Sequence, residues 1–288
     1  MTEVSRAVLV TGCSSGIGRA VARALAGAGW TVYASARRPE SVAGLAEDGC
    51  RPLALDVTDE ESRVAAVDAV IEAEGSVGVL VNNAGYSRSG AVEQVSLEDA
   101  HRQFETNLFG PARLSQLVLP GMRAQGWGKV VNISSMGGRL TFPGGGYYHA
   151  SKYALEALSD ALRFEVAGFG VDVVLVEPGF IRTGFSDAAA TTIADPAPGG
   201  DDPYAAFTAG VLASTRDVYR RGLLARLAGD PDDVAEVVLR ALTTAKPKAR
   251  YPVTASARIL HGLRAVLSDR AWDSLMARQF VQPSRASG

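Results

Sequence analysis

The chain has 288 residues, of which 47% are hydrophobic, enough apolar material for one large domain spanning residues 1–288. The charges nearly balance at a net −2 and form no block of one sign, which argues against a nucleic-acid partner. No apolar stretch reaches the ~18 residues that a membrane span needs, and no signal peptide is apparent, so we expect a cytoplasmic protein. Cys13 and Cys50 lack metal-ligand spacing, so we expect neither a metal site nor a disulfide.

Short apolar runs alternate with amphipathic segments over most of the chain. Strands are expected at 6–11, 31–35, 53–57, 77–81, 129–133, 171–176 and 250–254. Strands and helices that alternate at this spacing indicate parallel βαβ units with right-handed crossovers. We therefore predict a single Rossmann-type α/β domain: a doubly wound parallel sheet with helices on both faces and a C-terminal helical extension.

Capping residues mark where several helices begin. Thr58 with Glu61 predicts one helix, and Ser96 predicts a long helix that runs towards Pro120. Asp230, followed by proline, predicts another. The expected buried stripe of the first of these helices consists of Val64, Val67 and either Val70 or Ile71.

The regular alternation ends near residue 183. We expect a substrate loop or lid at 183–229, with a mobile part at 187–203 and a helix near 203–227. The mobile part has little apolar area to offset the entropy of ordering, so we expect it to close only when a ligand binds. Residues 255–288 form a C-terminal extension, with one terminal helix expected at 259–280.

Tyr148 and Lys152 stand four residues apart at the start of an alanine-rich run with helical periodicity, so both side chains leave the same face. A phenol has a pKa of about 10, and a nearby ammonium lowers that pKa by stabilising the phenolate. The pair is therefore a candidate proton donor and acceptor. Tyr147 is the rival, but it lies roughly 140° around a helix from Lys152.

A glycine-rich stretch at 12–18 follows the first strand and opens a helix. In this context backbone N–H groups can approach a pyrophosphate at the positive end of the helix dipole. Its spacing is GxxxGxG rather than the commoner GxGxxG, and a purely structural tight turn is the alternative. Other candidate positions have plain alternatives too: a turn for 82–85, solvent exposure for Arg37 and Arg38, a strand-end cap for Asp56, and an exposed helical position for Asn107.

Taken together, these motifs resemble the short-chain dehydrogenase/reductase family over roughly 7–183. The matching segments are TGxxxGIG at 11–18, NNAG at 82–85, Asn107, Ser135, YxxxK at 148–152 and the Pro-Gly to Thr loop at 178–183. The family's usual distance of about thirteen residues between serine and tyrosine selects Ser135 over Ser134. Segments 32–38 and 177–180 are similar to the hydroxysteroid and retinol dehydrogenase branch, whereas the small, acidic 187–203 loop departs from it.

The resemblance implies hydride transfer between a nicotinamide and a carbonyl or secondary alcohol. Tyr148 would exchange a proton with the substrate oxygen, and Ser135 would hold that oxygen. Lys152 would lower the tyrosine pKa and hydrogen-bond the nicotinamide ribose, while Asn107 would seat a water linking Lys152 to solvent. The cofactor-binding residues that it implies are Gly12, Ser14, Ser15, Gly16, Ile17, Gly18, Arg37, Asp56, Val57, Asn83, Ala84, Gly85, Tyr148, Lys152, Pro178, Gly179, Ile181 and Thr183.

The tip of the second strand indicates which cofactor is preferred. NAD-selective sites place a carboxylate there to bind the ribose 2′-hydroxyl, and that carboxylate repels a 2′-phosphate. Here the tip reads Ser35-Ala36-Arg37-Arg38, with no carboxylate. Arg37 can present a planar guanidinium to a phosphate. We predict that NADP(H) is preferred, with NAD(H) possible.

These observations favour a cytoplasmic NADP(H)-preferring ketone reductase or alcohol dehydrogenase with a fairly apolar substrate. The expected wall of the substrate pocket consists of Tyr86, Met136, Phe142, Phe180, Ile181 and Phe185. A non-catalytic nucleotide-sensing or scaffold protein of the same fold is the alternative, and the intact Asn107, Ser135, Tyr148 and Lys152 set argues against it. A methyltransferase would need an acidic residue at the second strand's tip and has no use for YxxxK.

The resemblance also implies a homodimer or homotetramer. The helix that carries Tyr148 has a small-residue face that would permit a close two-fold contact. That face could instead pack against the protein's own sheet. It is formed by Ala150, Ala154, Ala157 and Ala161.

Overall fold

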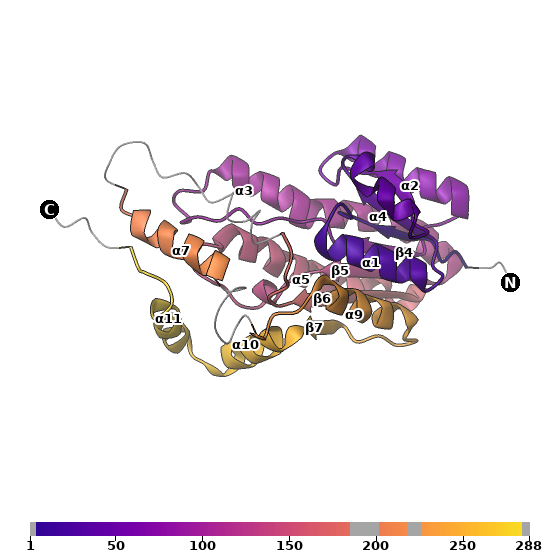
Figure 1. Ribbon diagram of the computed structural model, residues 1–288. Helices are drawn as coiled ribbons and strands as arrows, with labels where there is room; N and C mark the ends of the chain where they lie inside the picture. Colours follow the sequence, from indigo (N-terminus) through magenta and orange to yellow (C-terminus); the bar gives the residue numbers. More distant parts are fainter. Residues whose placement is uncertain (1–3, 185–201, 218–225, 284–288) are drawn as a thin grey trace.

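The computed structural model describes residues 4–184, 202–217 and 226–283. Their centre is a seven-stranded sheet whose strands all run parallel (Figure 1). Across the sheet the strands are β3 (Arg51–Ala54), β2 (Val32–Ala36), β1 (Val8–Val10), β4 (Val79–Asn82), β5 (Gly128–Ile133), β6 (Val171–Pro178) and β7 (Arg250–Val253). The order reverses between β1 and β4, where a doubly wound sheet opens a crevice at the carboxyl ends of its strands. The predicted fold is confirmed.

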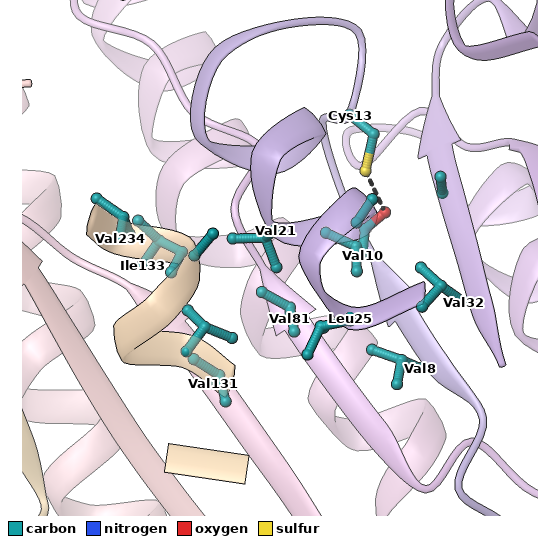
Figure 2. Packing of buried hydrophobic residues seen from close by; sticks show 14 of the residues in the cluster. Val8, Val10, Cys13, Val21, Leu25, Val32, Val81, Val131, Ile133 and Val234 are labelled. Atoms are coloured by element: carbon teal, nitrogen blue, oxygen red, sulfur yellow. Dashed lines mark hydrogen bonds between the residues drawn. The ribbon is translucent and has the colours of Figure 1, made fainter. Parts of the chain in front are cut away.

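Successive side chains of a strand point to opposite faces of the sheet, so the core is divided between the two faces. Val8 and Val10 face α1 (Gly16–Gly27) and α9 (Pro231–Thr243), and Figure 2 shows them packed with Val21 and Leu25. On the opposite face, Leu9 belongs to a second cluster with side chains of α2 (Glu60–Glu74), α4 (Gly110–Gln125) and α5 (Gly146–Val166). A strand with both faces covered is apolar at every position, as β1 is.

Two predicted boundaries at the β3 edge are wrong by a few residues. The predicted strand at 53–57 instead ends at Ala54, and Leu55 and Val57 turn inward to the core. The helix that follows is capped by Asp59, which accepts a hydrogen bond from the Ser62 N–H at 2.7 Å, and not by Thr58. Thr58 instead donates its hydroxyl to Asp56 Oδ1 at 2.8 Å, which leaves the next residue free to cap. The helix buries Val67 and Val70, and Ile71 is exposed.

The long helix predicted from Ser96 is interrupted. Ser96 caps α3 (Leu97–Phe104) as expected, by accepting from the Asp99 N–H. A π-helical turn at Glu105–Phe109 follows, and α4 then continues through Pro120 to Gln125. The burial of Val118 and Met122 on either side of Pro120 offsets the backbone hydrogen bond that proline cannot donate. π-Turns inside helices are frequent at functional sites.

The C-terminal third differs from the prediction in its tail. Its tail forms two helices instead of one, α10 (Thr254–Val266) and α11 (Asp269–Ala277), because Ser268 caps a new start by accepting from the Ala271 N–H. The expected helix at 203–227 is seen as α7 (Ala205–Asp217). Figure 1 shows α7, α10 and α11 gathered at the end of the molecule away from the N-terminus. The expected lid at 187–203 lies largely outside the described residues.

Among the helices in the described part of the chain, none combines the length and apolarity needed to cross a bilayer. Both cysteines are buried and free.

Candidate active site

Tyr148, Lys152 and Ser135 come together at the carboxyl end of β5. Tyr148 and Lys152 lie in the first two turns of α5, and Ser135 is the second residue after β5. The Ser135 side chain hydrogen-bonds the Tyr148 phenol, and it also accepts from the Gly137 N–H at 3.0 Å. Lys152 is buried and donates to the Ile133 carbonyl at 2.9 Å. The serine, the phenol and the ammonium therefore share one site.

Burial dominates the protonation of both titratable groups. Desolvation raises the pKa of Tyr148 above its usual 10, and the hydrogen bond from Ser135 acts in the opposite direction. The lowering by Lys152 that the sequence predicted is therefore not the net effect in this structure. Desolvation lowers the pKa of Lys152 to about 8, against the opposing charge of Glu156. In a low-dielectric site, a change in a nearby charge shifts the pKa of these groups more than it would in water.

Asn107 lies in the π-helical turn and is fully buried. Its side chain accepts from the Tyr86 N–H at 3.1 Å and donates to the Tyr86 carbonyl at 3.0 Å and to Ser151 Oγ at 3.1 Å. Ser151 in turn donates to the Tyr148 carbonyl at 2.7 Å. A Cβ on Gly85 would lie 3.1 Å from Asn107 Oδ1 and 3.6 Å from Lys152 Nζ. Asn107 thus joins the segment after β4 to the start of α5, next to the lysine.

The glycine-rich loop allows a close backbone approach at the switch point between β1 and β4. A Cβ on Gly18 would lie 2.3 Å from the Gly12 carbonyl oxygen, and Gly12 has a φ of +73°. Ser15 begins α1 without a side-chain cap, and Ser14 and Ser15 are exposed. The first N–H groups of α1 thus lie at an accessible helix end without that cap, as a pyrophosphate site requires. These features fit a dinucleotide cofactor.

Thr11 and Asn83 hold this loop against β4. Thr11 Oγ1 accepts from the backbone N–H groups of Asn83 and Ala84, both at 2.9 Å. The Asn83 side chain donates to the carbonyls of Thr11 at 2.9 Å and Gly12 at 3.1 Å. Asn83 was expected as a cofactor-binding residue, and here its amide nitrogen supports the glycine loop. Thr11 was read only as part of the motif, and its bridging role was not foreseen.

The other expected cofactor positions surround the same crevice. Arg37 and Arg38 are exposed at the end of β2, and Asp56 and Val57 follow β3. Ile17 is half-buried in the first turn of α1.

Across the crevice, β6 ends at Pro178, and a Cβ on Gly16 would lie 3.4 Å from Thr183 Cγ2. The backbone at Gly179 passes close to α10, because a Cβ there would lie 2.4 Å from Ser256 Oγ. The Ile181 side chain is buried in the core beneath, so only its backbone is left to face a ligand.

A loop at 136–145, which we call the 136–145 loop, runs from Ser135 to the start of α5. His149 fastens it: Nδ1 contacts the Gly137 carbonyl at 2.9 Å, and Nε2 accepts from the Phe142 N–H at 3.0 Å. Because a backbone N–H can only donate, His149 is neutral with its proton on Nδ1. Phe142 stacks on Phe180 with ring centroids 6.3 Å apart. The loop and the segment after β6 thus present an aromatic pair, and the Phe142 ring centroid lies 5.9 Å from that of His149, the residue next to Tyr148.

The C-terminal extension fastens the same loop from outside. His261 on α10 contacts the Met136 carbonyl through Nε2 at 3.2 Å, and Trp272 on α11 donates to the Thr141 carbonyl at 3.3 Å. Leu140 packs in a cluster with Trp272, with Phe142 at its edge. Sequence reasoning did not find these histidine and tryptophan contacts, because no local pattern signals a partner so far along the chain.

The expected pocket wall is partly assembled. Phe142, Phe180 and Tyr86 are half-buried near the site, whereas Met136 and Ile181 are buried. Phe185 lies outside the described residues.

Comparisons with known proteins agree with this geometry. The family model described as short chain dehydrogenase matches residues 6–194. A short-chain dehydrogenase from Streptomyces avermitilis has a similar structure, with a TM-score of 0.78, 39% identity and 95% of each chain covered. The alcohol dehydrogenase from Thermococcus sibiricus complexed with 5-hydroxy-NADP has a TM-score of 0.69, 25% identity and coverage of 88% of this chain and 97% of its own. The NADPH-dependent 3-dehydrocapnine reductase of Ornithobacterium rhinotracheale is 32% identical over 98% of this chain and 100% of its own.

The family match covers well over half of the chain, and the relative aligns along its whole length. In this chain Ser135 lies beside Tyr148, and Lys152 stands one helical turn further along α5. The chain belongs to the short-chain dehydrogenase/reductase family and is an oxidoreductase that acts on CH–OH groups with NAD(P).

Proposed function

We propose that the protein is an NADP(H)-dependent oxidoreductase that interconverts a ketone and a secondary alcohol in a fairly apolar substrate. The observation that carries this proposal is the hydrogen bond between Ser135 and Tyr148, one helical turn from the buried Lys152. A phenol held by a serine hydroxyl can pass a proton to a carbonyl oxygen that enters between them. A non-catalytic scaffold has no need of this arrangement.

The cofactor supplies the hydride when it is bound, and the chain's own residues do the rest. Ser135 and Tyr148 orient the substrate oxygen and stabilise the charge that develops on it during reduction. Tyr148 then gives its proton to that oxygen, or accepts it in the reverse direction. Lys152 places a positive charge beside the phenol, which favours the phenolate left after proton transfer. Asn107 and Ser151 hold the start of α5 so that these groups keep their positions.

The NADP(H) preference rests on the β2 tip, where Arg37 and Arg38 are exposed and no carboxylate is present. The Thermococcus enzyme, complexed with an NADP derivative, and the NADPH-dependent relative support the same cofactor. The aromatic pair of Phe142 and Phe180 supports an apolar substrate. The relative named as an NADPH-dependent 3-dehydrocapnine reductase supports the reductive direction.

We also propose that the protein is a cytoplasmic homodimer or homotetramer that uses the outer face of α5. Ala150, Ala157 and Ala161 are exposed and so do not pack on the protein's own sheet. Phe164 on the same helix is 88% exposed. A second copy placed across this face would cover these side chains.

The test is a cofactor assay. NADPH would be incubated with a panel of ketones and aldehydes that differ in chain length, and NADP⁺ with the matching alcohols, while the absorbance of the reduced nicotinamide is followed. We expect turnover that is faster with NADPH than with NADH and that rises with the apolar length beside the carbonyl. No change in absorbance with any substrate, while NADPH binding is retained, would favour the nucleotide-sensing alternative.

A further inference from the structure

A group of buried charged side chains extends from Lys152 away from the candidate active site. Lys152 and Glu156 stand four residues apart on α5, and each is 5% exposed. Glu177, the last residue but one of β6, is 0% exposed. The proposed chemistry uses Lys152 and gives no role to the two carboxylates. Buried carboxylates are costly unless they are paired, so their presence here calls for a physical reason.

Glu156 Oε1 and both carboxyl oxygens of Glu177 are buried and have no hydrogen-bond partner in the described part of the chain. Because ionised carboxylates can only accept, one proton held between the two groups would satisfy these oxygens. Arg250 on β7 bridges them, with Nε 3.0 Å from Glu156 Oε2 and 3.3 Å from Glu177 Oε1. Burial, followed by the charge of Glu156, raises the pKa of Glu177 to about 7. Below about pH 7 the pair therefore holds one proton and one negative charge, and above that pH Glu177 loses the proton.

A pocket lies close to the pair on the side of α10. His261 Nδ1 lies 3.6 Å from Glu177 Oε2, and Arg139 Nη1 lies 3.9 Å from Glu177 Oε1. Both residues line a pocket of about 200 Å³, so the pocket is separated from Glu177 by these two side chains. The charged and titratable groups around the pair are Lys152, Tyr153, Asp160 and Arg163 on α5, Arg250 on β7, Arg139 after the Met136–Gly138 turn, and His261 and Arg264 on α10.

Lys152 is the catalytic group that this negative charge can affect. Burial lowers the pKa of Lys152, and Glu156 opposes that shift. Residues one turn apart on a helix lie about 6 Å apart, where a unit charge in a partly buried site shifts a pKa by roughly one unit or more.

We propose that Glu156 is a positioning residue that keeps Lys152 charged, and that the proton of the pair resides with Glu177, so that Glu156 keeps its negative charge. The proposal rests on the proposed function for what Lys152 does in the reaction. Its claim about the charge state of Lys152 stands apart from turnover and can be measured directly.

The chain has four lysines, Lys129, Lys152, Lys246 and Lys248, so protein labelled with ¹³C-lysine gives a simple spectrum. The Lys152→Met variant identifies the Lys152 signal by its loss. In the wild type we expect the Lys152 Cε signal to titrate near pH 8. Glu156→Gln should lower this midpoint by about one unit or more, and Glu156→Asp, which keeps the charge at position 156, should leave it within a few tenths. Glu177→Gln should lower the midpoint less than Glu156→Gln does and should remove the inflection near pH 7.

An unchanged Lys152 midpoint in Glu156→Gln would overturn the proposal. If that variant does not fold, as judged by circular dichroism, the wild type still decides: its Lys152 signal should show a second, smaller inflection near pH 7 as the pair titrates, and a single-step curve would refute the proposal. A charge on Lys152 that depends on Glu156 in an enzyme without turnover would refute the proposed function and leave the pair intact.

Activity supplies a second readout. The alkaline limb of the kcat/KM profile should move to lower pH in Glu156→Gln by the same amount as the NMR midpoint, and Glu156→Asp should restore it. A uniform loss of activity at every pH would indicate a merely structural role and contradict the proposal.

Discussion

The cofactor side and the substrate side of the candidate site differ in what holds their backbone. On the cofactor side, Thr11 and Asn83 join the ends of two adjacent central strands, and Gly18 lets the loop close on itself. On the substrate side, two residues of the C-terminal helices hold the 136–145 loop. His261 bonds Met136 from 125 residues further along the chain, and Trp272 bonds Thr141 from 131 residues further along. The cofactor side is therefore fixed by the sheet, whereas the shape of the substrate side depends on the C-terminal extension.

The largest effect should come from breaking the cofactor side alone. Gly18→Ala places a Cβ 2.3 Å from the Gly12 carbonyl oxygen, so the loop must move. We expect NADPH binding to be abolished and the free energy of unfolding to fall by roughly 1–3 kcal/mol. NADPH titration and urea denaturation measure the two effects.

Gly27→Ala is the matched control on the same helix, because a Cβ there meets nothing within 4 Å. It should leave NADPH binding unchanged and stabilise the protein by roughly 0.5–1 kcal/mol. Equal losses in the two variants would show that the close approach at Gly18 does not matter.

Cofactor choice should change next. Charge-assisted hydrogen bonds contribute on the order of 1.5–3 kcal/mol, which corresponds to roughly a ten- to hundredfold preference. The double change Ala36→Asp and Arg37→Leu should move the ratio of kcat/KM values for NADPH and NADH towards NADH by that factor. Arg38→Leu is the control and should do less. A wild-type enzyme already faster with NADH would show that Arg37 does not select the cofactor.

The substrate side can be altered through His149 without disturbing the cofactor side. His149→Phe removes both of the ring's bonds to the loop at Gly137 and Phe142. We expect the KM for the ketone to rise about tenfold or more, while the dissociation constant for NADPH stays the same. His149→Gln, which can still accept from the Phe142 N–H, should recover part of the loss. A parallel weakening of NADPH binding would show that the two sides are not independent.

The same residue makes stability depend on pH. Burial lowers the pKa of His149 below its usual 6.5. A group whose pKa is lowered on folding contributes its full stability above the unfolded pKa and loses it as the pH falls towards the folded pKa. We therefore expect the wild type to lose stability below pH 6.5 in urea titrations, and His149→Phe to lose less. The same decline in both proteins would exclude His149 as the source.

The smallest effect should follow Trp272→Phe. It removes one hydrogen bond to the Thr141 carbonyl and keeps most of the packing against Leu140. We expect a loss of roughly 0.5–1.5 kcal/mol in stability and a small rise in the KM for substrate. Thermal unfolding and steady-state kinetics measure the two effects. Trp30→Phe is the control for the loss of an indole, because the Trp30 ring stacks on Arg6 and not on the loop.

The sequence predicts the cofactor side better than the substrate side, and the reason is physical. Positions such as Gly12, Gly18 and Asn83 act through the local backbone, so their spacing along the chain fixes their geometry. The pairing of His261 with Met136 or of Trp272 with Leu140 depends on how distant helices pack, and no local pattern encodes it. The early end of β3 at Ala54 was missed for a similar reason, because residues beyond the edge strand are buried by α2 and α4 and so still look strand-like.

The central claim is that Tyr148 exchanges the proton with the substrate, and Tyr148→Phe tests it most directly. This change keeps the ring and removes only the hydroxyl that Ser135 bonds. With NADPH and the best ketone from the panel, we predict that turnover falls by ~10² or more while NADPH still binds, and that Tyr147→Phe stays close to wild type. Retained turnover in Tyr148→Phe, or a larger loss in Tyr147→Phe, would contradict the assignment.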